Sequence, residues 1–374
     1  MNRSQSNPFK FGGPVVGEYY LPRMELAQAV TQFLQNRIPV VLIGARRLGK
    51  TSFVLHLLNH FEEEGYCTVF ADIFNITSHR DFLCQMLRAI KTKKRWTAAI
   101  KESLSNLRPI VAADFDPHTS QSSFEISLDR SSEKEVKERI QDVLAGLDKL
   151  GEKVVFVIDE FQKITEIDDD GWLEATLRIH MQRLRNVSFL FTGSRRSIIY
   201  DMLNNHTRPL YRSCQSIEFP VFGEEFTDWI IQRFATSGIE CDKIAIEHLR
   251  NLVLDTPNYV QMVCFHLVAE GKKHISMQEV ETTLGTVVRQ NAYAYQTLLN
   301  TLTQIQQRAL RLAAKESKQI FSKELLAKYE IASPPALASA IKALKEKTIL
   351  DEERTGRGTV IFDDPLFAIW LKIS

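Results

Sequence analysis

The segment Gly44–Thr51 constrains the fold more than any other part of the chain. It reads Gly-Ala-Arg-Arg-Leu-Gly-Lys-Thr and directly follows a short apolar run at 38–43. An apolar run that stops at a glycine is typical of a buried strand. In the next stretch, apolar residues fall on one helical face: Phe53, Val54, Leu57, Leu58 and Phe61. A strand, a glycine-containing turn and an amphipathic helix in this order predict the start of an α/β unit.

The same segment carries the residue types that hold phosphate groups. Glycines let the backbone curl so that successive N–H groups point inward, and the start of the following helix adds a positive dipole end. Lys50 has the length to reach β- and γ-phosphates, and the Thr51 hydroxyl is suited to Mg²⁺. A chance match is the alternative, which the position between a strand and a helix disfavours. We therefore predict an ATP and Mg²⁺ site formed by Gly44, Ala45, Arg46, Arg47, Leu48, Gly49, Lys50, Thr51 and Ser52.

A further apolar run, at 154–158, is followed by two adjacent acids, Asp159 and Glu160. A carboxylate at a strand end can hold Mg²⁺, which is the role predicted for Asp159. A second carboxylate beside it can orient or deprotonate a water for attack on the γ-phosphate, which is the role predicted for Glu160. Two exposed acids at a strand end are the alternative. The acid pair favours ATPases with an additional strand over small-molecule kinases, which need no hydrolytic glutamate there.

A polar turn follows the apolar run at 187–191. In ATPases with an additional strand, the end of that strand carries a polar sensor, and Thr192, Ser194 and Arg195 stand in that place. Arg195 has the charge and the fork geometry to meet a γ-phosphate. A basic surface turn is the alternative, and the sequence does not distinguish Arg195 from Arg196.

Patterning along the chain predicts three domains. Strands alternate with helices up to Pro220, which predicts a parallel α/β sheet over 1–220. Residues 221–295 read as entirely helical. Residues 296–374 predict three helices and then two short strands around a glycine-containing turn, the order of a winged helix. Ser333 is the expected N-cap of the third of these helices, with Pro334 in its first turn.

Composition excludes several classes of protein. The 374 residues include 47 Lys or Arg and 46 Asp or Glu, so total charge indicates no partner. The five cysteines have neither zinc-site nor disulfide spacing, which favours reduced thiols in a cytoplasm. The N-terminus has no secretory signal, and no apolar run approaches the roughly 18 residues of a membrane span.

Two segments suggest a nucleic acid partner. Arg88–Trp96 places basic residues beside a tryptophan, which suits a phosphate backbone or an anionic membrane, although a solvated helix end is the simpler interpretation. The helix at 333–347 would be the one that enters DNA. It begins with Pro, Ala and Ser, which do not read base edges as Arg, Asn or Gln do. Packing against the core or a protein partner is the favoured role of the winged helix.

Together these motifs resemble the STAND-type relatives of AAA+ ATPases, specifically the archaeal-type ATPase family that is also common in bacteria. The resemblance spans nearly the whole chain. It begins at Asn7-Pro8-Phe9 and Arg23-Met24-Glu25-Leu26, continues through the segments described above and closes at Asp364-Pro365-Leu366-Phe367, with Trp370 in the same signature.

The resemblance implies a P-loop sheet of strand order 5-1-4-3-2, a helical lid and a C-terminal winged helix. It implies that Leu21 and Arg23 line the adenine pocket and that Pro257 of the lid contacts the nucleotide. The family has Gly-x-Pro at this point, whereas this chain has Asp255 in place of the glycine. It further implies a slow ATPase switch that acts on an unidentified protein partner. The alternative is a DNA-associated regulator whose winged helix works under ATP control.

Overall fold

The computed structural model describes residues 6–91, 110–115, 122–127, 132–149, 151–316, 319–351 and 360–374. The chain forms two compact units. The first, here called the helical unit, comprises Met1–Leu21, Arg46–Gly49 and Pro220–Ser374. The second, the core unit, comprises Pro22–Ala45 and Lys50–Phe219.

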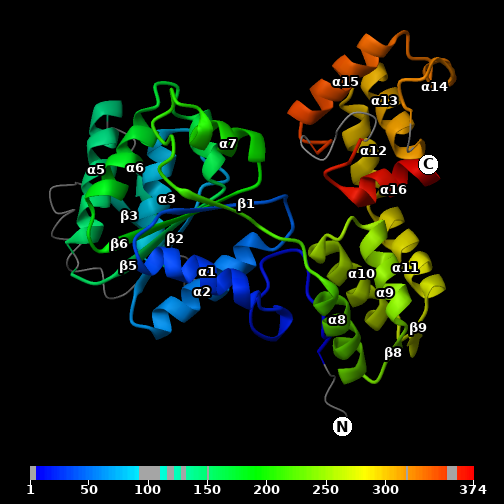
Figure 1. Ribbon diagram of the computed structural model, residues 1–374, viewed down its shortest axis with the longest axis horizontal. Helices are drawn as coiled ribbons and strands as arrows, with labels where there is room; N and C mark the ends of the chain where they lie inside the picture. Colours follow the sequence, from blue (N-terminus) through cyan, green and yellow to red (C-terminus); the bar gives the residue numbers. More distant parts are fainter. Residues whose placement is uncertain are drawn as a thin grey trace. The chain divides into compact units, whose positions relative to one another are not determined.

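A five-stranded parallel sheet forms the centre of the core unit (Figure 1). Its strands are β1 (Val40–Ile43), β2 (Cys67–Asp72), β5 (Val154–Asp159), β6 (Val187–Gly193) and β7 (Gln215–Glu218). Their order across the sheet is β2-β5-β6-β1-β7. Numbered along the chain as first to fifth, this is 2-3-4-1-5, so the predicted order is confirmed. β5 and β6 are buried along their whole length, which explains their continuous apolar sequences.

Helices cover both faces of this sheet (Figure 1). They are α1 (Met24–Gln35), α2 (Lys50–Glu63), α3 (His79–Lys91), α5 (Glu133–Asp148), α6 (Trp172–Arg183) and α7 (Arg196–Asn204). Side chains of α3, α5, α6 and α7 share one apolar core with alternate residues of the strands. The connection from β1 to β2 runs toward the β2 edge of the sheet, and the later connections run back toward the β7 edge. Because such crossovers are right-handed, α2 lies on the face of the sheet opposite to α3, α5, α6 and α7.

The stretch between α3 and α5 is polar in sequence and shows no clear periodicity. It contains β3 (Ile110–Phe115) and β4 (Ser122–Ser127), which pair antiparallel. β3 and β4 form a separate two-stranded sheet and do not join the main sheet. The sequence around them therefore lacks the strand–helix–strand pattern that indicates a parallel sheet. Residues 92–96 of the basic segment lie outside the described residues.

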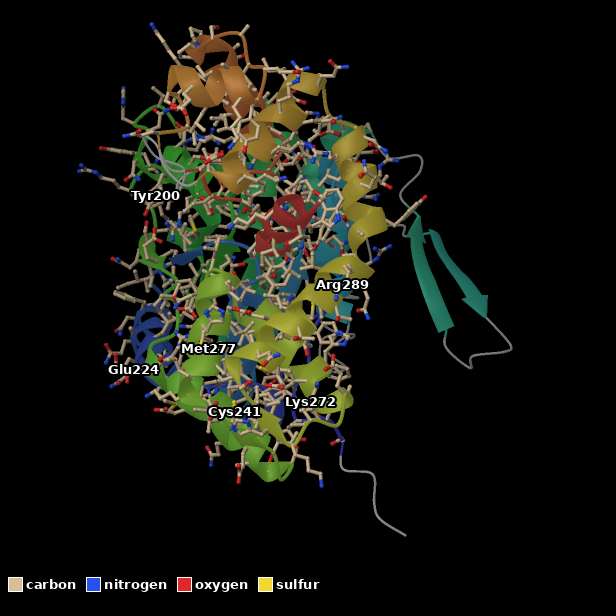
Figure 2. All side chains as sticks on the ribbon, turned by 90° about the vertical axis from the view of Figure 1, so that its right-hand side faces the viewer. Tyr200, Glu224, Cys241, Lys272, Met277 and Arg289 are labelled. Atoms are coloured by element: carbon tan, nitrogen blue, oxygen red, sulfur yellow. The ribbon has the colours of Figure 1, made fainter. Side chains whose placement is uncertain are left out.

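The first part of the helical unit is a bundle. It contains α8 (Glu224–Thr236), α9 (Lys243–Leu252), α10 (Pro257–Ala269), α11 (Met277–Gln290) and α12 (Ala292–Asn300). The prediction of an entirely helical segment missed β8 (Glu240–Cys241) and β9 (His274–Ile275), which pair in parallel. Figure 2 shows Cys241 in this region and Met277 and Arg289 at the two ends of α11. Burial raises the pKa of the Cys241 thiol to about 12, so this thiol stays protonated at neutral pH.

The last part of the chain begins with α13 (Gln304–Lys315), α14 (Lys323–Lys328) and α15 (Pro334–Glu346). As predicted, the Ser333 side chain caps α15, accepting a hydrogen bond from the Ala336 N–H. Of the expected hairpin, a bridge between Leu350 and Phe362 is present, and residues 352–359 lie outside the described residues. The closing signature forms α16 (Pro365–Ile373), capped by Asp364.

The N-terminal Asn-Pro-Phe segment belongs to the helical unit. Phe9 is fully buried in its apolar core and lies 4.7 Å, between ring centroids, from Phe234. The Pro8 carbonyl accepts two hydrogen bonds from Arg233, at 3.1 and 2.9 Å. Within the described residues, no helix is long and apolar enough to cross a membrane.

Candidate nucleotide site

The loop after β1 places Lys50 at the first position of α2. The Lys50 ammonium is buried and donates hydrogen bonds to the carbonyls of Gly44, at 2.7 Å, and Ala45, at 2.9 Å. The Gly44 N–H donates to the Gly193 carbonyl at 3.2 Å, which ties the loop to the end of β6. The loop therefore curls around its own lysine, as a phosphate-holding loop requires.

The middle of the loop, Arg46–Gly49, groups with the helical unit. Gly49 has φ +95°, a conformation that side chains disfavour, so a glycine is required there. Arg47 also has positive φ, at 64°. Its guanidinium donates a hydrogen bond to the Tyr259 hydroxyl and lies 3.8 Å from a carboxylate oxygen of Asp364. Leu48 and, in the core unit, Ser52 are buried.

Asp159 ends β5 beside the start of α2. Its carboxylate accepts hydrogen bonds from the Thr51 hydroxyl, at 2.8 Å, and from the buried Thr192 hydroxyl of β6. Burial raises the pKa of Asp159, against the lowering effect of these two hydroxyls. The structure thus brings together the two residues predicted to hold Mg²⁺, through an arrangement of hard oxygen donors that suits this ion.

Glu160 follows Asp159 in a left-handed conformation, with φ 59° and ψ 43°. This conformation is uncommon for a residue with a side chain and turns the chain sharply at the end of β5. The Glu160 carboxylate accepts a hydrogen bond from the Ser194 hydroxyl at 2.8 Å and another from the Gln162 amide. The predicted hydrolytic residue therefore lies against the end of β6, where the predicted sensor begins.

The predicted sensor residues divide into two groups. Thr192 and Ser194 contact the carboxylates of Asp159 and Glu160, as described above. Arg195 instead lies 4.0 Å from Glu166, and Arg196 forms an ion pair with Glu218 at 2.7 Å. Among the described contacts, no ion pair or hydrogen bond joins Arg195 to the acids at the end of β5.

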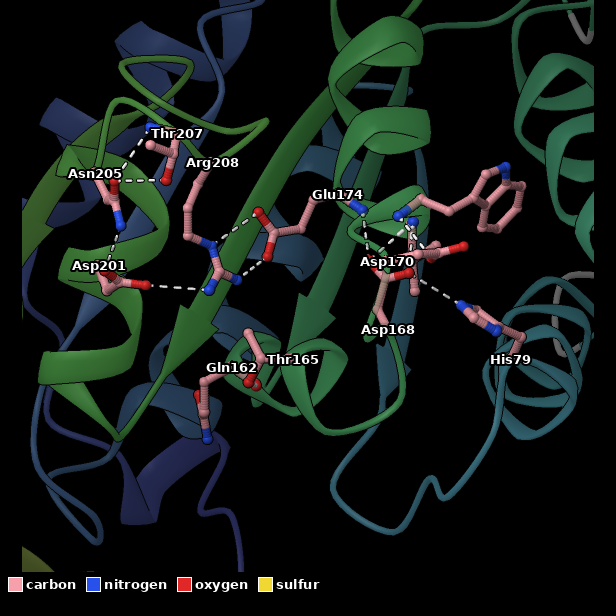
Figure 3. A network of polar contacts seen from close by, with 12 residues as sticks. His79, Gln162, Thr165, Asp168, Asp170, Glu174, Asp201, Asn205, Thr207 and Arg208 are labelled. Atoms are coloured by element: carbon pink, nitrogen blue, oxygen red, sulfur yellow. Dashed lines mark hydrogen bonds and ion pairs between the residues drawn. The ribbon is translucent and has the colours of Figure 1, made fainter.

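A buried polar network follows the turn after Glu160 along the chain (Figure 3). That turn is the 3-10 helix η3 (Phe161–Glu166), which holds Gln162 and leads to Asp168. The buried Asp168 carboxylate accepts hydrogen bonds from the N–H groups of Leu173, at 2.9 Å, and Glu174, at 3.2 Å, at the start of α6. It also contacts His79 Nε2 at 3.2 Å, and this hydrogen bond raises the pKa of His79 despite its burial.

The residues implied for the adenine site lie in both units. The Arg23 guanidinium stacks on Phe219 in the core unit, 4.6 Å from the ring centroid. Leu21 packs against the core of the helical unit, where Pro257 begins α10 and is buried. Sequence reasoning gave no role to Gln162, whose side-chain amide donates a hydrogen bond to the Glu160 carboxylate. Its position two residues after the acid is a usable signal once the turn geometry is known.

The turn before α10 explains how Asp255 replaces the glycine of the Gly-x-Pro pattern. Leu254 and Asp255 have φ values of 53° and 52°, the left-handed region that glycine favours. The Asp255 carboxylate accepts two hydrogen bonds from Arg250, at 2.7 and 2.9 Å. The chain therefore keeps the backbone shape of a glycine and stabilises it with an ion pair. Sequence reasoning also missed Arg250.

Comparisons with known proteins agree with this geometry. Residues 34–200 match the AAA domain family, and residues 293–373 match a family described as a probable winged helix domain. No curated protein sequence matches the chain.

Solved structures have the same fold over almost the whole chain. A Walker-type ATPase of Pyrococcus abyssi has 18% identity and a TM-score of 0.65, over 97% of this chain and 99% of that chain. The ORC2 protein of Aeropyrum pernix, in its ADPNP–ADP complexes, has 16% identity and a TM-score of 0.58, over 96% and 95%. The ORC1 protein of Aeropyrum pernix in complex with DNA has 13% identity and a TM-score of 0.51, over 95% and 94%. At these identities the likeness shows the fold alone.

Proposed function

We propose that this chain, which holds an AAA-type P-loop ATPase domain and a C-terminal winged helix, is a Mg²⁺-dependent, cytoplasmic ATP switch of the STAND type that acts on a protein partner. The observation that carries the proposal is the meeting of four groups at one edge of the sheet. Lys50 and Thr51 begin α2, Asp159 and Glu160 end β5, and the Thr51 hydroxyl contacts the Asp159 carboxylate.

The loop and Lys50 would bind the nucleotide. Lys50 now satisfies its ammonium with the carbonyls of Gly44 and Ala45, and a phosphate oxygen is a stronger, charged acceptor for the same donor. The backbone N–H groups of the loop and the start of α2 add to the attraction for phosphate. Leu21, Arg23 and Pro257 would contact the base and sugar.

Thr51 and Asp159 would hold Mg²⁺. One hydroxyl and one carboxylate match the small number of protein ligands that this ion takes beside a nucleotide. The described part of the chain has no cluster of three or more His, Cys, Asp or Glu suited to a metal, so a protein-only cage is not the alternative there. When bound, the ion supplies charge that stabilises the phosphate oxygens and favours the ionised form of the buried Asp159.

Glu160 would orient a water and accept its proton during attack on the γ-phosphate. The Thr192 hydroxyl, on the adjacent strand, donates a hydrogen bond to the Asp159 carboxylate. Asp159 would therefore hold Mg²⁺ while Glu160 acts on the water. Arg195 would meet the γ-phosphate after leaving Glu166, to which it has only a long contact of 4.0 Å. Arg196 is the less suitable cation because its ion pair with Glu218 is much closer.

Three parts would carry the switch: the ATPase core at 1–220, the helical lid at 221–295 and the winged helix at 296–374. A nucleotide that binds one arrangement of these parts better than another shifts the population toward it, and a partner protein reads the result.

A DNA-associated regulator is the alternative. One solved structure of the same fold is the ORC1 protein in complex with DNA, and Lys342 of α15 is exposed. In its first half, α15 exposes only small or apolar residues, namely Pro334, Pro335, Ala338 and Ser339, and these provide little direct base readout. Contacts would then run through phosphates, so retention on random duplex DNA that falls steeply with salt supports this alternative.

Replacing Lys50 tests the proposal. Lys50→Ala removes a charge-assisted contact worth about 1.5–3 kcal/mol, which weakens ATP binding by roughly 10- to 100-fold. Titration with a fluorescent ATP analogue measures the change. Lys153→Ala is the matched control, because Lys153 precedes β5 at the opposite edge of the sheet and stacks on Tyr66. Equal affinity of the Lys50 variant and the wild type would refute a phosphate site in this loop.

A further inference from the structure

We infer that Gln162 and Ser194 are positioning residues that hold one oxygen of Glu160 and leave the other free to accept a proton from the attacking water. The inference rests on the proposed role of Glu160 in hydrolysis. It assigns a function to Gln162 that neither the loop motif nor the acid pair suggests.

Two donors converge on a single atom, Glu160 Oε2. The Ser194 hydroxyl donates to it at 2.8 Å, and the Gln162 side-chain amide donates to it from the turn that follows β5. The Gln162 amide nitrogen also lies 3.4 Å from the Ser194 hydroxyl oxygen, so the two holders contact each other. In the part of the chain that the structure describes, no group donates a hydrogen bond to the second oxygen, Glu160 Oε1. A carboxylate held in this way has one fixed oxygen and one with lone pairs available for a water.

The left-handed backbone at Glu160 makes such holders necessary. A residue with a side chain in this conformation is strained and persists only when its surroundings fix it. A carboxylate at the end of a flexible side chain would otherwise sample several rotamers. The two hydrogen bonds select one of them.

Gln162 itself is poorly explained as a purely structural residue. It is 1% exposed, yet its side-chain oxygen Oε1 has no hydrogen-bond partner among the described residues. Leaving such an oxygen unsatisfied destabilises the fold, and an apolar side chain of the same size would avoid this cost. The one described side-chain task of Gln162 is donation of its amide N–H groups toward Glu160 and Ser194.

Gly193 provides the space that this arrangement needs. A Cβ atom on Gly193 would lie 2.5 Å from Gln162 Oε1 and still closer to Ile199. The end of β6 therefore supplies both the hydroxyl of Ser194 and the room for the amide. The predicted sensor segment is consequently in direct contact with the residue proposed to activate water.

Steady-state kinetics of four variants test the inference. Gln162→Met keeps the length and burial of the side chain and removes the donor; Ser194→Ala removes the hydroxyl. Each should lower kcat by about 10- to 100-fold, the effect of a small misplacement of a catalytic group, with KM for ATP changed less than about 2-fold. Ser194→Thr restores a hydroxyl and should recover most of kcat. Ser188→Ala is the matched control, because Ser188 is a buried hydroxyl on the same strand that donates to the Leu34 carbonyl.

The Glu160→Gln background separates this inference from the proposed function. If Gln162 acts through Glu160, Gln162→Met should have no further effect on the residual rate of Glu160→Gln. Wild-type turnover by Glu160→Gln overturns the proposed role of Glu160. An impaired Glu160→Gln together with an unchanged or faster Gln162→Met overturns only the positioning role. Equal losses in Gln162→Met and Ser188→Ala would indicate general damage to the strand and also overturn it.

Discussion

In each unit, a turn that bears on the proposed function holds an acidic residue in a conformation that favours glycine: Glu160 in the core unit and Asp255 in the helical unit. Glu160 follows β5 with φ 59°, and Asp255 precedes α10 with φ 52°. Both side chains are fixed by hydrogen bonds, but the bonds are distributed differently. Ser194 and Gln162 converge on one oxygen of Glu160, whereas Arg250 donates to both oxygens of Asp255.

This difference suits a proposed catalytic role for Glu160 and a structural role for Asp255. Arg250 also donates to the carbonyls of Phe222 and Gly223 and to the Thr227 hydroxyl, so it joins the start of α8 to the turn before α10. The ion pair engages both oxygens of Asp255. Glu160 keeps one oxygen unoccupied at the edge that also holds Lys50 and Thr51. The proposed catalytic role of Glu160 thus goes with a carboxylate that has one oxygen without a hydrogen-bond donor among the described residues.

The largest expected effect comes from replacing Glu160, the member of the pair that is proposed to be catalytic. Glu160→Gln should lower hydrolysis by on the order of 10²–10⁴, the usual contribution of a general base, because the amide cannot accept the proton. ATP should stay bound, since Lys50 and the loop are unchanged. Phosphate release and nucleotide retention are measured on the same sample.

Asp255→Asn is the matched control for this change. Asparagine tolerates the left-handed region, and Asp255 has no proposed part in hydrolysis. Its phosphate release should equal that of the wild type. If the two variants lose hydrolysis equally, the distinction between the two turns is wrong.

An intermediate effect is expected on stability in the helical unit. Arg250→Ala leaves the Asp255 carboxylate and two carbonyls without their donor, so the free energy of unfolding should fall by about 2–4 kcal/mol. Asp255→Gly loses the ion pair but relieves the strained conformation, so its net cost should stay within about 1 kcal/mol. Urea unfolding of both variants gives the comparison.

Arg289→Ala is the control for the arginine change, because Arg289 is an arginine at the end of α11 with one described hydrogen bond, to Thr286. It should alter stability by less than about 0.5 kcal/mol. A cost of Asp255→Gly as large as that of Arg250→Ala would mean that the conformation at Asp255 is not strained.

The fold was predictable from sequence to the extent that each element carries its own signal. Apolar runs gave β5 and β6 because both are buried on both faces. Ser333 gave the start of α15 because capping is a local interaction. The β3–β4 pair and the two-residue strands β8 and β9 were missed, because their pairing is decided by partners elsewhere in the chain.

The residues proposed to bind and hydrolyse ATP were predictable from the sequence, but the residues that hold them in place were not. The loop motif around Lys50 and Thr51 and the position of Asp159 at a strand end indicated that these residues share one task, and the structure places Thr51 in contact with Asp159. Gln162 and Arg250 have no motif, since each acts through the direction of a side chain within a turn. Such a direction depends on backbone angles that the sequence pattern does not encode.

The smallest expected effect concerns the polar network around His79, which follows the turn of Glu160 along the chain. His79 is buried between Asp168 and Glu133, with its ring nitrogens 3.2 and 2.7 Å from their oxygens, and the hydrogen bond to Asp168 is the main cause of its raised pKa. Because the pKa in the folded state lies above the unfolded value of about 6.5, protonation stabilises the fold. This contribution is complete below pH 6.5 and disappears as pH rises through the folded-state pKa.

The free energy of unfolding of wild type should therefore exceed that of His79→Gln by more at pH 6 than at pH 8.5. His274→Gln is the control, because His274 is exposed and contacts Asp242 on the protein surface. The pH profile of kcat should be the same in wild type and His79→Gln, since His79 contacts none of the residues proposed to bind or hydrolyse ATP. A stability gap that grows with pH would show that His79 is held neutral. A shifted pH profile of kcat would show that the network around His79 takes part in positioning Glu160. Within the core unit, catalytic and structural roles would then not be separate.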